Sequence, residues 1–378
     1  MAPPAAIVVQ VRRSLDDATA RKWSNNDILY DINEGGQYLQ NLLKVLKCRR
    51  SLSSVANQRE YALPTDMKEI LEMEFYDEGS IHKVQGMNYD TYREYKAQRT
   101  GSIPYIYSVI PNESKILIEP VCNSAADTTT LGADLTAVAT SMTVASNASF
   151  YDEGRVIIDS EVIGYTGKTS TTTLTGLTRG LEGTTAATHS SAATVTERDI
   201  MLYGVYGLSD FEMRKYYTTG TGSVTFTYGS VTVTGTSVTW SNNVAAGDYI
   251  AYTTNATQVV PTKWYAISSV PDTSTLVLTS AYAESTTASS NYIVSSPNPF
   301  PNEYDALLRT YARARALEKS NSMKEADREW AIFGSQVSAI KNRLTSSDVL
   351  IVQRGRYEGR IRDSQRFRAN LGDKYPIV

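Results

Sequence analysis

The sequence contains few of the side chains that commonly carry catalysis or bind metals. Among its 378 residues are two cysteines, Cys48 and Cys122, and two histidines, His82 and His189. Two cysteines cannot form a disulfide framework for a chain of this length. Two histidines, far apart and in unlike contexts, leave few general bases that titrate near neutral pH. We therefore expect no cofactor and no metal site, and any catalytic site would have to rest on carboxylates, hydroxyls or lysines alone.

Long apolar runs and an excess of positive charge are also missing. No run approaches the roughly 18 apolar residues that a membrane helix needs. Residues 1–9 lack the charged start and the long apolar stretch of a secretory signal. Lys and Arg number 37 against 40 Asp and Glu, which gives a formal charge of -3, whereas a protein that mainly grips nucleic acid needs a basic surface. We expect no membrane insertion and no specific recognition of DNA.

The one clear excess is in tyrosine, with 25 residues against 7 phenylalanines. Tyrosine combines a large apolar face with a polar tip, which suits interfaces that stay partly hydrated. Tyrosine is also favoured in β-strands. The composition therefore indicates either surfaces that contact other proteins or a chain rich in strands.

The first third of the chain alternates helical and strand patterns. Apolar residues recur at three- and four-residue spacing between residues 24 and 46, which predicts a helix. Ser24 and Asp27 form a candidate capping box at its start, and the Gly35-Gly36 pair predicts a kink or a break in its middle. Short strands are expected at residues 59–64, 67–76, 103–110 and 115–120, and a short charged helix at residues 90–97.

Two stretches rich in Thr, Ser, Ala and Gly interrupt this pattern, at residues 123–198 and 218–296. Short runs within them alternate between apolar and polar residues with period two. Many short strands joined by Gly, Asn and Ser turns are typical of small barrels or sandwiches. We expect two small all-β domains inserted into one host, with residues 199–217 returning to the host between them.

The segment after residue 297 is helical again. Pro299 and Pro301 mark a helix start, and Glu303 and Asp305 suit the positive end of the helix dipole. The next helix carries an apolar seam spaced by three and four residues in turn, which must lie against another helix. The seam consists of Met323, Ala326, Trp330, Phe333, Val337, Ile340 and Leu344. We expect a hairpin within the chain; a coiled coil between chains is the alternative.

Residues 349–378 form a basic C-terminal arm. They carry six arginines and one lysine against three acids, a charge of +4, which leaves -7 for the other 348 residues. Arginine can form paired hydrogen bonds with a carboxylate, and the β-type run at residues 348–353 suits addition to the edge of another sheet. The arm residues expected to dock on a partner are Val349, Leu350, Ile351, Val352, Arg354, Arg356, Arg360, Arg362, Arg366 and Arg368. The alternative is a solvated terminus.

Motifs for bound ligands are weak. The run Gly164-Tyr-Thr-Gly-Lys168 has two residues between its glycines, where a phosphate loop needs four. His189 lies in a Thr/Ser turn with no cysteine or second histidine nearby, so a metal site is not expected there. A glycoside hydrolase site with two paired carboxylates stays a possible alternative, because the sequence does not show which acids meet in space.

Several segments, taken in order, resemble the head-to-tail adaptor proteins of tailed bacteriophages. The run Trp23-Ser-Asn-Asn-Asp27-Ile-Leu-Tyr-Asp-Ile-Asn33-Glu34, preceded by Arg12-Arg-Ser-Leu-Asp16, resembles the family's opening and first helix. The run Tyr61-Ala-Leu-Pro64-Thr-Asp66 is similar to its strand that ends in Leu-Pro-x-Asp. Pro299-Phe-Pro301-Asn-Glu303-Tyr304 resembles the start of its final helical hairpin. The likeness covers residues 7–121 and 297–345, and the two insertions resemble modules of phage tail and connector proteins.

The resemblance implies a structural virion protein, assembled in the host cytoplasm and located in the neck between the capsid portal and the tail. The resemblance implies a non-enzymatic ring, as in other such adaptors, commonly of twelve copies. DNA would pass through this ring without specific recognition. The implied partners are further copies of the chain, the portal protein, and tail or nozzle proteins that meet the β-insertions.

These observations predict an α+β multidomain fold. Its parts are a discontinuous α-helical adaptor core with short strands at residues 1–122 and 297–348, β-insertions at 123–198 and 218–296, a connector at 199–217, and the extended arm at 349–378. The predicted function is an adaptor ring that joins head to tail and lets DNA pass. The alternative is a tail or host-surface component whose β-domains bind carbohydrate.

Overall fold

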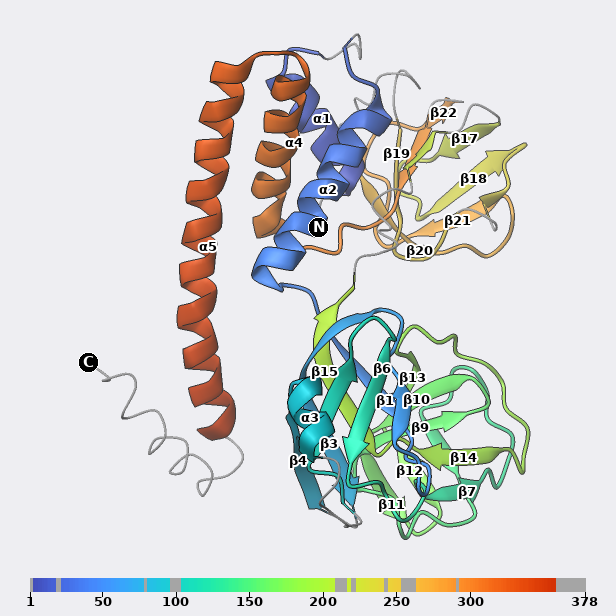
Figure 1. The fold of residues 1–378 in the computed structure, drawn as a ribbon. Helices are drawn as coiled ribbons and strands as arrows, with labels where there is room; N and C mark the ends of the chain where they lie inside the picture. The colour runs from blue at the N-terminus through green and yellow to red at the C-terminus, as the bar shows by residue number, and fades with distance from the viewer. Residues whose placement is uncertain are drawn as a thin grey trace. The chain divides into compact units, whose positions relative to one another are not determined.

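The computed structural model describes residues 3–17, 22–77, 80–95, 103–207, 216–218, 222–240, 244–252, 263–289 and 292–357. The fold is mixed α+β, with strands in the majority (Figure 1). It divides into two compact units. Unit 1 comprises Met1–Leu43 and Asp210–Val378, and unit 2 comprises Lys44–Ser209. The expected core of residues 1–122 and 297–348 is thus divided between the two units.

Unit 1 contains a layer of four helices built around α4 (Asp305–Lys319). The helices α1 (Pro4–Ser14), α2 (Asn25–Leu43) and α5 (Met323–Tyr357) each pack against α4 (Figure 1). A short 3-10 turn, η4 (Asn302–Tyr304), leads into α4. Both faces of α4 are apolar, since Leu307, Leu308, Ala312 and Ala316 are all buried. A helix that is buried on several sides is the natural centre of such a layer.

Arg12 at the end of α1 ties α1 to the beginning of α2. Its guanidinium donates to Asp17 Oδ2 at 3.0 Å, to the Trp23 carbonyl at 2.7 Å and to Asn25 Oδ1 at 2.8 Å. The side chain is buried, and a buried guanidinium needs partners of this kind for its donors. This explains why Arg12, Asp17 and Trp23 occur together at the opening of the chain.

The predicted capping box at the start of α2 is confirmed. The Ser24 N–H donates to Asp27 Oδ2 at 2.9 Å, and the Asp27 N–H donates to Ser24 Oγ at 3.1 Å. These bonds satisfy N–H groups that would otherwise lack partners at the helix start. They also lower the pKa of Asp27.

The break expected at Gly35-Gly36 is absent, because α2 is continuous from Asn25 to Leu43. The glycine serves instead to bring two helices close together. A Cβ atom on Gly35 would lie 2.8 Å from Cδ1 of Tyr311 on α4, which is closer than a carbon atom can normally sit. The absence of a side chain at Gly35 therefore lets the Tyr311 ring rest on the backbone of α2.

Gly35→Ala is expected to destabilise unit 1 by about 1–3 kcal/mol, because the added methyl overpacks the contact with Tyr311. Gly334→Ala in α5 is the matched control, since a Cβ atom there meets nothing within 4 Å. That change should stabilise the helix by roughly 0.5–1 kcal/mol. Denaturation followed by tryptophan fluorescence measures both, because Trp330 packs on Tyr311. Equal shifts of the two variants in one direction would contradict this packing.

The seam of the last helix faces α4 within the chain. Ala326, Phe333 and Val337 are buried, Trp330, Ile340 and Leu344 are half-buried, and Met323 is exposed. The rings of Tyr311, Trp330 and Phe333 form an edge-to-face cluster with centroids 5.1–5.8 Å apart. The structure therefore contains the expected hairpin within the chain, and the aromatic cluster lies at its centre.

The helix α5 continues well past the start of α4. It has 35 residues and α4 has 15, which correspond to about 52 and 22 Å at 1.5 Å per residue. The expectation of a β-type run at residues 348–353 is wrong, because these residues belong to α5. Extending an existing helix is easier than starting a new element, and the helix penalty of Val and Ile is small.

The second insertion forms an antiparallel sheet in unit 1 with the order β16-β23-β19-β20-β21-β18-β17-β22. Its strands are β16 (Tyr216–Thr218), β17 (Ser223–Phe226), β18 (Thr232–Thr236), β19 (Tyr249–Tyr252), β20 (Tyr265–Ser269), β21 (Thr275–Leu278), β22 (Thr287–Ser289) and β23 (Tyr292–Ser295). The strands β22 and β23 follow one another in the chain, yet they lie near opposite ends of the sheet. Two intervening residues span only about 10 Å, so the sheet must curl back on itself. The interior contains Phe226, Trp240 and Tyr292.

Unit 2 is built on a seven-stranded sheet with the order β1-β15-β3-β4-β5-β6-β2. Its strands are β1 (Lys47–Leu52), β2 (Glu60–Ala62), β3 (Met67–Asp77), β4 (Ser80–Gly86), β5 (Ile106–Ile110), β6 (Lys115–Glu119) and β15 (Ile200–Tyr206), and α3 (Tyr89–Tyr95) packs on β5. All pairs are antiparallel except β4 with β5. The strand β15 follows the first insertion in the chain and lies between β1 and β3. Because β15 pairs with both, the strands β1 to β6 belong to one sheet that is completed by a strand from beyond the first insertion.

The first insertion adds two further sheets to unit 2, with the orders β13-β10-β9-β14-β7 and β11-β12-β8. The strands are β7 (Thr128–Thr130), β8 (Ser141–Thr143), β9 (Gly154–Ile158), β10 (Glu161–Tyr165), β11 (Gly167–Ser170), β12 (Thr173–Thr175), β13 (Thr178–Leu181) and β14 (Thr194–Glu197). Both sheets contribute to one apolar core, which includes Met142, Ile158, Ile163 and Leu174. As expected, these stretches form short strands, and their apolar side chains are directed into this core.

Candidate functional site

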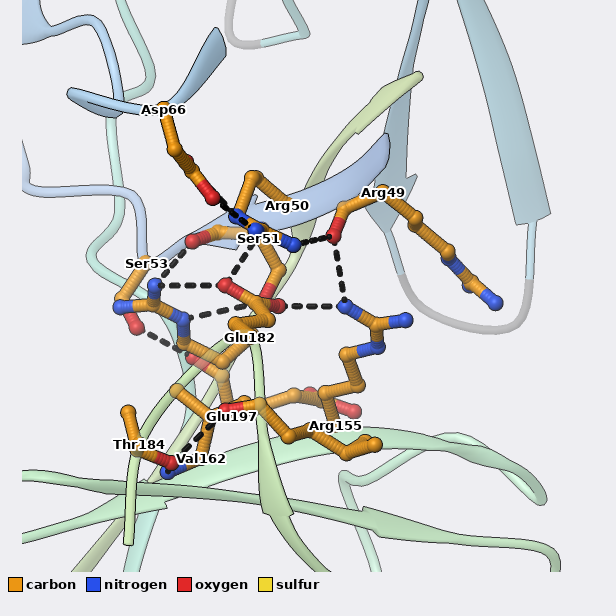
Figure 2. Close-up of polar contacts among 12 residues, drawn as sticks. Arg49, Arg50, Ser51, Ser53, Asp66, Arg155, Val162, Glu182, Thr184 and Glu197 are labelled. Carbon is orange, nitrogen blue, oxygen red and sulfur yellow. Dashed lines mark hydrogen bonds and ion pairs between the residues drawn. The ribbon is translucent and has the colours of Figure 1, made fainter. Parts of the chain in front are cut away.

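The edge of strand β1 is covered by side chains rather than by another strand. The Ser51 N–H donates to Glu182 Oε2 at 3.1 Å, and Arg198 donates to the Ser51 carbonyl. Arg155 donates to the Arg49 carbonyl at 3.5 Å (Figure 2). These backbone groups point away from β15 and would otherwise be free to pair with an added strand. We call Ser51, Arg155, Glu182 and Arg198 the edge junction.

The charges of the edge junction support one another. The Glu182 carboxylate pairs with Arg155 and lies 3.8 Å from Arg198. It also accepts from the Ser51 hydroxyl. Burial lowers the pKa of the Arg198 guanidinium, and the nearby carboxylate opposes that effect. One carboxylate from the first insertion thus binds two arginines and the backbone of β1 at once.

A second set of contacts joins the insertion to the chain that follows β1. The Ser54 N–H donates to Asp199 Oδ1 at 2.7 Å, and the Ser53 hydroxyl donates to the Glu197 carbonyl at 2.7 Å. Glu197 Oε1 accepts from the Tyr151 N–H at 3.0 Å and from the Tyr165 hydroxyl at 3.2 Å. Burial raises the pKa of Glu197 to about 7 and that of Asp199 to about 6.

These two acids predict a loss of stability in unit 2 as the pH rises from about 4.5 to about 7. Between these values folded Glu197 keeps a proton that the unfolded chain, with an ordinary pKa of 4.5, has released. The folded state therefore binds more protons, and the free energy of unfolding falls with rising pH. Glu197→Gln should flatten the pH dependence of the thermal midpoint measured by circular dichroism. The exposed Glu153→Gln should leave that dependence unchanged, and Asp199 should keep a smaller slope in Glu197→Gln. A Glu197→Gln protein with the full wild-type dependence would refute the assignment.

The most extensively bonded carboxylate lies inside the first insertion. Glu161 accepts from Arg179 Nε and Nη2 at 2.8 and 2.7 Å, from the Gly180 and Ala187 N–H groups at 2.9 Å each, and meets His189 Nε2 at 2.8 Å. Burial opposes its ionisation. The hydrogen bonds from Arg179, Ala187, His189 and Gly180 outweigh burial and lower the pKa of Glu161 to about 2. We call Asp159, Glu161, Arg179 and His189 the Glu161 cluster.

Some of the site residues predicted from the sequence lie on described helices, and others lie outside the described residues. The seam residues lie on α5 as described above. Six of the residues expected to dock on a partner belong to the helix α5: Val349, Leu350, Ile351, Val352, Arg354 and Arg356. Arg360, Arg362, Arg366 and Arg368 lie outside the described residues. Lys168 of the rejected phosphate-loop motif donates to the Phe150 carbonyl, a bond within the insertion.

Sequence reasoning missed both polar clusters. His189 was expected in a turn with no cysteine or second histidine nearby, and its two carboxylate partners, Asp159 and Glu161, were not foreseen. One available signal was Glu161 itself, an acid at the head of the apolar run Val162-Ile163 in a buried strand, since a buried charge requires partners. Within the described ranges, no group of three His, Cys, Asp or Glu residues is arranged to hold a metal ion. No helix among those residues is long and apolar enough to cross a membrane.

These features define a protein of several α and β modules, whose polar clusters fasten strands and modules to one another. Residues 5–157 match the family model of the SU10 adaptor protein. The match runs from α1 through the first six strands of unit 2 and into the first insertion as far as β9. It supports a phage adaptor or structural protein, and hence a virion component. No curated protein matches the chain.

Proposed function

We propose that the chain is a non-enzymatic adaptor that assembles into a ring between the portal of a tailed-phage head and the tail. The match of residues 5–157 to the SU10 adaptor protein family carries this proposal. Copies with a formal charge of -3 each would surround the passing DNA without attracting it strongly. A structural role needs surfaces for neighbours, and unit 1 offers one.

That surface is the exposed side of α2. One side of α2 is buried, whereas Tyr30, Tyr38 and Leu42 are 59%, 48% and 41% exposed. They lie eight and four residues apart, which places them along one side of the helix. Tyrosine-rich surfaces of this kind suit partly hydrated contacts between proteins. We assign this stripe to the contact between neighbouring copies.

The arm at residues 349–378 is proposed to bind the portal. Its charge of +4 and its six arginines suit paired contacts with carboxylates. Since residues 349–357 continue α5, the arm would leave the unit as an extension of that helix rather than as an added strand. The β-insertions would then remain available for tail or nozzle proteins.

The ring is tested by mass photometry of the purified full chain, which should show a single closed oligomer; twelve copies are expected. Replacing both Tyr30 and Leu42 by Ser should shift the population to monomers with unchanged circular dichroism; Tyr38 is left in place because its ring also packs on Tyr311 and Phe333. A wild-type chain that is monomeric at micromolar concentration, alone and with portal rings, would refute the proposal.

The arm is tested separately by binding to portal rings. Replacing Arg360, Arg362, Arg366 and Arg368 by Gln should abolish binding, while the oligomer stays intact. A deletion of residues 349–378 should do the same. Competition with duplex DNA distinguishes carboxylate contacts from contacts with DNA, because salt weakens both. Portal binding that survives the deletion would exclude the arm model.

A further inference from the structure

His189 is held between two carboxylates inside the first insertion. Its Nδ1 lies 2.7 Å from Asp159 Oδ2, and its Nε2 lies 2.8 Å from Glu161 Oε2. A carboxylate oxygen without a proton can only accept a hydrogen bond, and a neutral imidazole has a single N–H to donate. Both contacts can therefore be hydrogen bonds at the same time only when the ring of His189 is protonated on both nitrogens.

Charged groups surround the ring. Glu161 is ionised throughout the neutral range, and the side chain of Asp159 is 67% exposed. The other charged groups on the elements that pack here are Arg179, bound to Glu161, and Asp134, which accepts from the Ser191 N–H beside the Leu135–His189 bridge. With His189 protonated, two cations face the Asp159 and Glu161 carboxylates across bonds of 2.7–2.8 Å.

The same stretch of chain also carries Glu182, one residue of the edge junction. Residues 178–189 contain Arg179, Gly180, Ala187 and His189, all bound to Glu161, and Glu182, bound to Ser51 of β1. Thr184 within this stretch accepts from the Val162 N–H at 3.1 Å (Figure 2). A change at His189 therefore acts on the segment that positions the Glu182 carboxylate on the edge of the seven-stranded sheet.

We propose that His189 is a proton-dependent latch for the first insertion. In its protonated form it bridges Asp159 to Glu161 and fixes residues 178–189, so that Glu182 stays on the edge of β1. Loss of the proton removes one of the two bridges and loosens this segment. The attachment of the insertion to the seven-stranded sheet is thereby coupled to the proton on a single side chain.

The first test reads the ring directly. With only two histidines in the chain, ¹⁵N NMR of the imidazole nitrogens gives two resolved sets of signals, and His82→Gln assigns them. Both nitrogens of His189 should carry a proton at pH 6, the pH of the exchange experiment below. A His189 ring with one N–H at every pH at which the protein is folded would overturn the latch.

The second test measures the segment. In hydrogen exchange on the full chain at pH 6, His189→Gln should speed exchange of residues 178–189 and of the Ser51 amide by about tenfold. Gln is uncharged, and both of its N–H donors lie on one nitrogen, whereas the protonated ring donates from two nitrogens on different sides. His82→Gln is the matched control and should change neither. If the variant fails to fold, exchange measured on the wild-type chain at several pH values tests the proposal instead. After correction for the intrinsic pH dependence of exchange, its residues 178–189 should lose protection as the His189 ring becomes neutral. Protection that does not respond to the His189 proton would overturn the proposal.

Discussion

Glu161→Gln is expected to lower the free energy of unfolding of the first insertion by about 3–5 kcal/mol. The change removes the charge from a carboxylate that is 1% exposed and that holds Arg179 and His189. Arg179 is itself 8% exposed in its side chain, so it would be left as a buried charge without its counterion. The loss of one partner of a buried pair is much more damaging than the loss of an exposed pair.

Hydrogen exchange of residues 154–197 measures this effect, and tryptophan fluorescence supplies an internal control. All four tryptophans, Trp23, Trp240, Trp264 and Trp330, belong to unit 1. Glu161→Gln should therefore shift the opening of the insertion and leave the fluorescence transition in place. The exposed Glu153→Gln should shift neither. A Glu161→Gln insertion as stable as the wild type would show that the five contacts of Glu161 contribute little.

Glu182→Ala is expected to destabilise unit 2 by about 2–4 kcal/mol and to cause self-association. The substitution leaves the Ser51 N–H without an acceptor and removes the counterion of Arg155. It also uncovers the edge of β1, and an uncovered edge strand pairs readily with other chains. Two effects are thus expected from one side chain, one on stability and one on solubility.

Glu182→Gln separates these two effects. The amide oxygen still accepts from Ser51, but the charge that binds the arginines is gone. It should lose part of the stability and keep most of the edge protection. Chemical denaturation followed by circular dichroism measures stability, and light scattering after chromatography measures association beyond the wild-type oligomer. A Glu182→Ala protein that is less stable yet no more associated would show that the edge is protected by other means.

Local features of the fold were predictable because they depend on neighbours in sequence. The capping box of Ser24 and Asp27 needs only residues three apart, and it occurs as expected. The strands of both insertions follow the alternation of Thr with apolar residues, for example β21 (Thr275–Leu278). The helical hairpin follows from the spacing of the seam. In each case the physical signal lies within a single element.

The features that were missed depend on residues far apart in the chain. Glu182 meets Ser51 across a separation of 131 residues, and His189 meets Glu161 across 28. No local pattern names such partners. The close contact at Gly35 was missed for the same reason, since it depends on Tyr311 on another helix. The run at residues 349–352 was assigned by composition, whereas the helix that precedes it decided its conformation.

The position of β15 has a consequence for how the chain folds. The strand β1 is joined to its sheet through β15 alone, and residues 47–52 pair with residues 200–205. During synthesis β1 must wait, unpaired, until the whole first insertion has left the ribosome. Pairings at such long range slow folding and prolong the time in which an open strand can meet a wrong partner. An insertion that completes its own core early would shorten that interval, which makes the speed at which this β-module folds a determinant of the yield of the entire protein.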